Sequence, residues 1–273
     1  MNKIAITMKK DIALDALESM HHALLITGNI FDLQVEPGND VLYYRPLYLA
    51  EKLYQKGMFV LRYSRSSGLT IHRYNDIKQD KKVLDDVLQR TGLNKFIGNN
   101  NISPTEVVEI FRGFKAIATS KYSVSFAIVV DYVPHLTSLQ SADREMQIVA
   151  ETISDIANLP SVQKAGNILI VYAYEENNLS PLLKVLNKVN YSYPGISEYE
   201  QFFKIISARK EEFAVTDLST QEAAKLSRGL NLSQLAALFR EAKAQNKSVT
   251  RNAIISEKEK LIEQISEKTL TVL

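Results

Sequence analysis

Two continuous apolar runs constrain the fold of this chain more than any other feature. They are VSFAIVVDYV at residues 124–133 and NILIVYAY at residues 167–174. Both are rich in β-branched residues and lack the polar alternation of a strand with one solvated face. We therefore expect two strands that helices cover on both faces, as in a parallel sheet.

Helical periodicity and shorter apolar segments alternate along the first two thirds of the chain. Further strands are predicted at residues 23–27, 58–63 and 190–193. Helices are predicted at residues 10–22, 45–57, 81–90, 104–118 and 141–157, with Ser103 and Pro104 at the start of the fourth. This order predicts a parallel sheet of about five strands with helices on both faces.

Beyond Pro194 the pattern changes to helices alone. They are predicted at residues 197–212, 219–227, 231–245 and 250–268. The expected organisation is an α/β domain at residues 1–195 followed by a small helical domain at residues 196–273. The 273 residues are 45% hydrophobic, which is enough for a substantial core.

Composition excludes several classes of function. The formal net charge is +2, so no strong basic field predicts binding to nucleic acid or to an anionic membrane. The chain has no cysteine, which excludes disulfides and thiolate chemistry and suits a reducing compartment. Neither a signal peptide nor an apolar stretch of membrane-spanning length is evident, and we expect a cytoplasmic protein.

The first strand and the helix after it have the order of a phosphate-binding unit, with a turn at Gly28 and Asn29 between them. A phosphate loop needs converging glycine N–H groups and a lysine. No lysine lies between Lys10 and Lys52, and the only formal cation there is Arg45. Three carboxylates occupy the segment: Asp32, Glu36 and Asp40. They would repel a triphosphate.

The helical part carries a family resemblance. DLSTQEAAKLSRGLNLSQLAALFREAKAQNKSVTRNAI resembles the lid of AAA+ ATPases of the AAA subgroup. The matching positions are Asp217, Leu218, Gly229, Leu235, Leu238, Glu241, Ala242 and Thr250. VSFAIVVDY is similar to the Walker B strand, and NILIVYAYEENNLSP to the sensor 1 strand. The resemblance implies a P-loop-NTPase-like α/β core followed by an α-helical lid.

The chain departs from this family in four parts of the phosphoryl-transfer machinery, beginning with the absent phosphate loop. Asp131 matches the magnesium-orienting aspartate, but Tyr132 stands in place of the glutamate that activates water. The polar sensor position is Tyr174, and the arginine-finger region offers only Lys184 and Lys188. The resemblance therefore implies a degenerate module that does not hydrolyse ATP, with no catalytic residue of its own.

Two sets of residues are candidate binding sites. Gly28, Asn29 and Asp131 would form a vestigial nucleotide site, although a turn and a strand-end cap also explain them. The segment 62–74 is rich in arginine and tyrosine, side chains that bind phosphates and stack on bases. Its candidate nucleic-acid contacts are Arg62, Arg65 and Arg73. A strand at the sheet edge with solvated charges is the alternative interpretation.

The first hypothesis is an assembly or regulatory platform of a larger AAA-type ATPase. The apolar end TLTVL suggests a cut between modules, so we expect a following AAA ATPase module in the same polypeptide, with ATP and magnesium bound only there. A homo-oligomer is a further expectation. The alternatives are an ATP-binding AAA ATPase, with Arg45 or the turn 65–68 replacing the lysine, and a nucleic-acid-binding module. Four lid residues are expected to hold the lid to the α/β core: Leu232, Leu235, Leu238 and Phe239.

Overall fold

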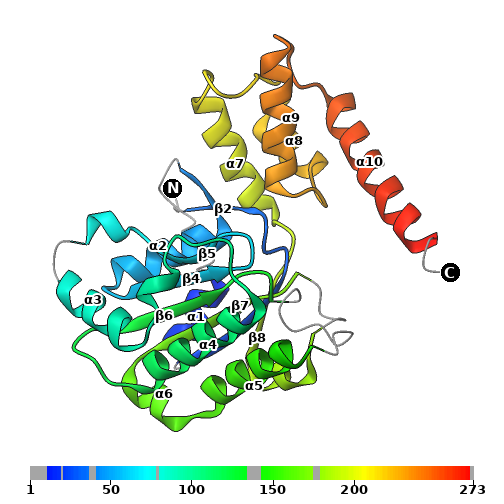
Figure 1. Cartoon of the computed structure of the whole chain (residues 1–273). Helices are drawn as coiled ribbons and strands as arrows, with labels where there is room; N and C mark the ends of the chain where they lie inside the picture. The colour runs from blue at the N-terminus through cyan, green and yellow to red at the C-terminus, as the bar shows by residue number, and fades with distance from the viewer. Residues whose placement is uncertain are drawn as a thin grey trace. The chain divides into compact units, whose positions relative to one another are not determined.

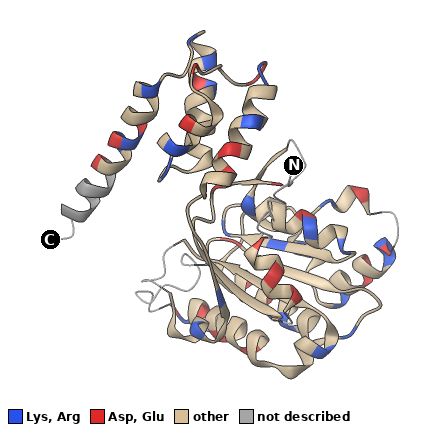
Figure 2. Cartoon of the chain, turned by 180° about the vertical axis from the view of Figure 1, so that it is seen from behind, with Lys and Arg blue, Asp and Glu red and all other residues tan. Residues whose placement is uncertain are grey.

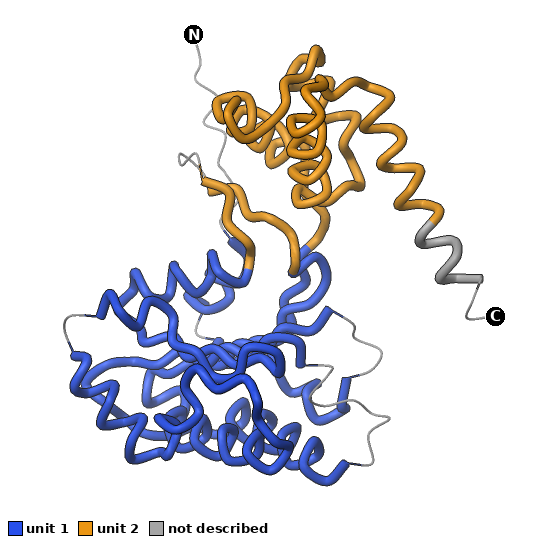
Figure 3. The backbone as a smooth tube through the Cα atoms, turned by 45° about the horizontal axis from the view of Figure 1, so that its top comes forward, with its two compact units in different colours: residues 1–30, 46–191 blue, residues 31–45, 192–273 orange. Residues whose placement is uncertain are grey.

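The computed structural model of the chain describes residues 11–19, 21–36, 41–77, 80–133, 143–174 and 179–270 (Figure 1). The chain divides into two compact units (Figure 3). The first comprises residues 1–30 and 46–191, and the second comprises residues 31–45 and 192–273. The sequence did not indicate that residues 31–45, which follow the first strand of the sheet, belong with the C-terminal helices.

A six-stranded sheet forms the centre of the first unit, in the order β5-β4-β6-β7-β1-β8. The strands are β1 (Ala23–Gly28), β4 (Phe59–Ser64), β5 (Gly68–Ile71), β6 (Phe126–Val130), β7 (Ile168–Tyr172) and β8 (Asn187–Tyr191). Five of them run parallel, as predicted, and β5 pairs antiparallel with β4. The sixth strand arises because the arginine-rich segment after β4 turns back as a hairpin along the sheet edge.

Helices cover both faces of this sheet because both faces are apolar. In β6 every residue is buried, and Ile128 lies between Leu61 of β4 and Leu169 of β7. These three side chains share one core cluster with residues of α3, α4 and α5. The helices of this unit are α1 (Ile12–Glu18), α2 (Arg45–Gln55), α3 (Lys81–Arg90), α4 (Pro104–Thr119), α5 (Arg144–Asn158) and α6 (Pro160–Ala165).

The start of α4 shows how closely local sequence signals can fix an element. Ser103 is the N-cap and Pro104 is the first helical residue, as predicted. The carboxylate of Glu106 accepts a hydrogen bond from the Ser103 backbone N–H at 2.9 Å, which completes a capping box. The short α6 was not predicted.

The second unit is helical apart from one hairpin. Its helices are α7 (Ile196–Ala208), α8 (Thr220–Leu226), α9 (Leu232–Ala244) and α10 (Arg251–Leu270). The hairpin pairs β2 (Leu33–Val35) with β3 (Leu42–Tyr44) in antiparallel register. Val35 of the hairpin is buried in one core cluster with α7, α8 and α9. The hairpin is therefore an integral part of the helical unit.

The apolar residues of α9 lie in the interior of this second unit. Leu232, Leu235 and Phe239 are fully buried there, whereas Leu238 is partly buried. The expectation that they hold the lid to the α/β core is therefore revised, because the lid needs them for its own core. Among the described residues, no helix combines the length and apolarity that crossing a membrane requires.

Candidate nucleotide site

The carboxyl end of β1 is where a phosphate loop would begin, and it is closely packed. Gly28 has φ +79°, and a Cβ at this position would clash with the side-chain amide of Asn190 and the carbonyl of Tyr191 on β8. The backbone N–H of Asn29 donates a hydrogen bond to the Tyr191 carbonyl at 2.8 Å. The glycine is thus explained by the close approach of β8, and this N–H group is already bonded to protein.

The segment after this turn forms the β2–β3 hairpin instead of a loop that leads directly into a helix. Asp32 is fully buried, and its Oδ1 accepts hydrogen bonds from the backbone N–H groups of Ser233 and Leu33, both at 2.8 Å. Ser233 lies in the first turn of α9, whose first N–H groups have no partners within the helix. A carboxylate there also interacts favourably with the helix dipole. Asp32, which would repel a triphosphate, therefore accepts a hydrogen bond from the first turn of α9.

The other two acidic residues of the segment differ from Asp32. The main-chain carbonyl of Glu36 accepts a hydrogen bond from the Gln201 side chain at 2.8 Å, so this part of the segment is also tied to α7. Asp40 lies outside the described residues. Arg45, the candidate replacement for the missing lysine, is the first residue of α2 and is buried. Its backbone N–H donates to the Asp32 carbonyl at 3.1 Å.

Asp131 follows β6 at the same edge of the sheet, and Arg62 of β4 pairs with it. The guanidinium Nη2 lies 2.7 Å from Oδ2 of Asp131, and the two side chains are only 17% and 12% exposed. Burial raises the pKa of the Asp131 carboxyl, and the nearby Arg62 charge opposes that rise. Within the described part of the chain, neither Oδ1 of Asp131 nor Nε of Arg62 has a hydrogen-bond partner.

These residues do not fit magnesium and a triphosphate. The place of a phosphate cradle at Gly28 is filled by β8, and a protein cation holds one oxygen of the carboxylate that would orient the metal. Magnesium requires oxygen ligands in a nearly octahedral arrangement. No cluster of three or more metal-ligating side chains exists among the described residues.

The other positions implied by the resemblance are less informative. Tyr132 has φ +57° and is exposed, and Tyr174 follows the end of β7 and is half-buried. Lys184 and Lys188 are exposed, the first near the chain's entry into β8 and the second within that strand. The residues 175–178, between the sensor position and these lysines, lie outside the described residues.

The three candidate nucleic-acid arginines are spread along the β4–β5 hairpin. Arg62 lies within β4 and is paired with Asp131, whereas Arg65 is exposed in the turn at the carboxyl edge. Arg73 follows β5 at the opposite end of the hairpin and pairs with Glu51 at 2.8 Å. Figure 2 shows basic and acidic residues interspersed over the first unit. The structure therefore does not gather these arginines into one basic surface.

Glu51 of α2 is the centre of a second buried charge cluster. Its carboxylate contacts His72 Nε2 at 2.9 Å and also accepts a hydrogen bond from Gln55 at 3.0 Å. Burial alone would raise the pKa of Glu51, but the hydrogen bonds from His72 and Gln55, together with the charge of Arg73, outweigh it and lower the pKa. This cluster was not predicted from the sequence. It ties the β4–β5 hairpin to α2.

The parallel α/β sheet, the acidic residue at the end of β6 and the helical unit that follows define an AAA+-type module. The family model described as "AAA+ chaperone, N-terminal Rossmann-like domain" matches residues 10–190. The model described as "AAA+ chaperone, second helical domain" matches residues 198–266. The chain therefore belongs to the AAA+ chaperone family, as its resemblance to AAA+ ATPases had indicated.

One similar solved structure is titled "Structure of E. coli MS115-1 HORMA:CdnC:Trip13 complex". A chain of that structure is 11% identical to this protein, with a TM-score of 0.50. The alignment covers 91% of this chain and 76% of that one. At this identity the likeness shows the fold alone. A comparison with curated proteins gave no match.

Proposed function

We propose that this chain is a non-hydrolysing AAA+ chaperone module that serves as an assembly or regulatory platform of a larger AAA-type ATPase. The ion pair between Arg62 and Asp131 carries the proposal. A carboxylate that orients magnesium must offer its oxygens to the metal and its water ligands. A guanidinium at 2.7 Å competes directly for one of these oxygens.

The first segment after β1 supports the same proposal. In an active nucleotide site, backbone N–H groups after the first strand point at phosphates. Here the N–H of Asn29 is bonded to β8, and the carboxylate of Asp32 is bonded to α9. The Asn29 N–H group and the Asp32 carboxylate thus form hydrogen bonds within their own units instead of binding a ligand.

The way in which the two units are connected suggests how a platform works without nucleotide. The chain passes from one unit to the other three times, after residues 30, 45 and 191. The inserted hairpin contributes Val35 to the core of the helical unit. We propose that these connections stabilise the helical unit, as a bound nucleotide does in an active module.

A platform needs an active motor. We propose that a following AAA ATPase module in the same polypeptide binds ATP and magnesium and performs hydrolysis. Self-association into a homo-oligomer would place several such modules together. Membership of the chaperone family supports a mechanical role of this kind, and the absence of a suitable phosphate cradle at Gly28 supports its assignment to another module.

Isothermal titration calorimetry with magnesium and ATP tests the proposal. We expect no saturable binding at micromolar to millimolar ATP and no hydrolysis above background. Saturable micromolar binding that is lost in Asp131→Ala would instead establish the alternative, an ATP-binding module with a diverged phosphate site. Arg45→Gln and Arg65→Gln would then show which arginine replaces the lysine.

A further inference from the structure

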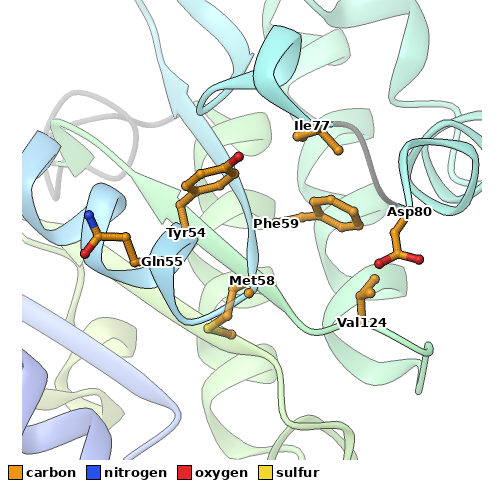
Figure 4. A pocket seen from close by; sticks show the side chains of 8 residues that line it. Tyr54, Gln55, Met58, Phe59, Ile77, Asp80 and Val124 are labelled. Carbon is orange, nitrogen blue, oxygen red and sulfur yellow. The ribbon is translucent and has the colours of Figure 1, made fainter.

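A pocket lies at the amino-terminal edge of the sheet, opposite to the edge that carries Asp131. Its volume is about 420 Å³, within the range of small-ligand sites. Figure 4 shows its lining, which comes from the end of α2, the start of β4, the approach to α3 and the approach to β6. The lining residues are Tyr54, Gln55, Gly57, Met58, Phe59, Ile77, Asp80 and Val124.

The pocket has an apolar interior and a polar rim. Phe59 and Ile77 of the lining are buried, and Tyr54, Met58 and Val124 are partly buried. The rim residues Gln55, Gly57 and Asp80 are exposed. Such a site suits a ligand with an aliphatic or flat portion and one polar end.

The one charged side chain that lines the pocket favours a cation. Asp80 is the only charged residue of the lining. In Figure 4 its carboxylate is turned toward Val124. Gln55 is the last residue of α2, so the partially negative carboxyl end of a helix also borders the pocket.

A neighbouring contact shows that one of these rings already accepts a guanidinium. The Arg73 guanidinium carbon lies 5.6 Å from the ring centroid of Tyr54. Flat guanidinium groups stack on aromatic rings more readily than the compact ammonium of lysine does. The aromatic lining and the Asp80 carboxylate therefore match arginine better than lysine.

We propose that this pocket binds an arginine side chain of a peptide segment from a partner protein. The guanidinium lies against the ring of Phe59 and pairs with Asp80, and the aliphatic stem contacts Met58 and Val124. A peptide is the appropriate source because the chain belongs to a chaperone family and because the pocket is larger than one side chain requires.

Amide chemical shifts of Gly57, Asp80 and Val124, followed by NMR during titration, test the proposal on the whole chain. The probes are acetyl-arginine amide, its neutral isostere acetyl-citrulline amide, free arginine and the tripeptide acetyl-Leu-Arg-Leu amide. We expect saturable shifts with acetyl-arginine amide and an affinity at least about five-fold above that of the citrulline probe. The tripeptide should bind more tightly than acetyl-arginine amide.

Asp80→Asn should abolish the preference for arginine over citrulline. Asp80 has φ +61°, a conformation that asparagine adopts as readily, so this variant keeps the backbone. Glu151→Gln removes an exposed carboxylate from α5 of the same unit and should change nothing. Equal binding of arginine and citrulline probes, or an unchanged preference in Asp80→Asn, would overturn the proposal. Tighter binding of free arginine than of the tripeptide would overturn the peptide as the source.

Discussion

Two buried carboxylates, one in each unit, are stabilised in different ways. Asp131 at the end of β6 is paired with the Arg62 guanidinium, and its second oxygen has no hydrogen-bond partner in the described part of the chain. Asp32 accepts hydrogen bonds from two backbone N–H groups, one of them at the start of α9. The partner of Asp131 is a side chain, which a single substitution can remove. The partners of Asp32 are backbone N–H groups, which a side-chain substitution does not remove.

Under the proposed function, this difference explains how a nucleotide-binding fold persists without its ligand. Backbone donors at a helix start stabilise a carboxylate as they would stabilise a phosphate. A buried ion pair, by contrast, has a desolvation cost that its attraction only partly offsets. We therefore expect the two sites to respond very differently to mutation and to pH.

The largest effect on the free energy of unfolding is expected from breaking the ion pair between Arg62 and Asp131. Arg62→Met leaves the charge of Asp131 buried without a partner, which should lower the free energy of unfolding by about 3 kcal/mol. Urea denaturation at neutral pH measures this. The double variant Arg62→Met with Asp131→Leu removes both charges and should recover most of the loss. A double variant as unstable as the single one would show that packing of the arginine stem, and not charge, is responsible.

A smaller effect is expected at the capping carboxylate. Asp32→Ala removes the acceptor for the Ser233 and Leu33 N–H groups and should cost about 1–2 kcal/mol, as other helix caps do. Asp32→Asn keeps an acceptor oxygen and should lose less. Denaturant unfolding of the two variants, followed by circular dichroism, makes this comparison. If alanine costs no more than asparagine, these hydrogen bonds do not hold α9.

The smallest effects concern pH. The pKa of Asp131 is raised in the folded chain, so its ionisation opposes folding. The stability difference between the wild type and Asp131→Asn should therefore shift in favour of the wild type as pH falls from neutral through the raised folded pKa toward the unfolded pKa of 3.8. Urea midpoints across this range provide the measurement, and a difference that stays constant would contradict the raised pKa.

Glu51 should show the opposite dependence. Its pKa is lowered in the folded chain, so its contribution to stability is present above the unfolded pKa of 4.5 and is lost as pH falls through the folded pKa. The advantage of the wild type over Glu51→Gln should accordingly shrink on acidification. The same urea series measures it, and an advantage that grows at low pH would exclude the cluster with His72 as the cause.

Local signals predicted most of the first unit. The apolar runs that became β6 and β7 are covered on both faces, and the capping residues Ser103 and Pro104 placed the start of α4. The hairpin β2–β3 was not predicted because its strands are three residues long and its packing partners lie more than 150 residues away. Such long-range packing leaves little trace in a local pattern.

The sequence indicated individual residues of the candidate site but not the contacts between them. The missing lysine and the acidic segment after Gly28 were visible in the sequence, and Asp131 and Arg62 were both singled out, but for separate roles. Their pairing depends on the neighbouring positions of β4 and β6 in the sheet, which sequence spacing does not reveal. The capping of α9 by Asp32 likewise joins residues 201 positions apart.

Amide hydrogen exchange of α9, measured with and without magnesium and ATP, tests the central claim most directly. The hairpin and Asp32 are proposed to stabilise the helical unit and so to replace a bound nucleotide. We predict that the amides of residues 235–244 are protected in the free chain, that ATP leaves their exchange unchanged, and that Asp32→Ala accelerates it. Rapid exchange in the free chain that becomes slow only when ATP is added would contradict the account.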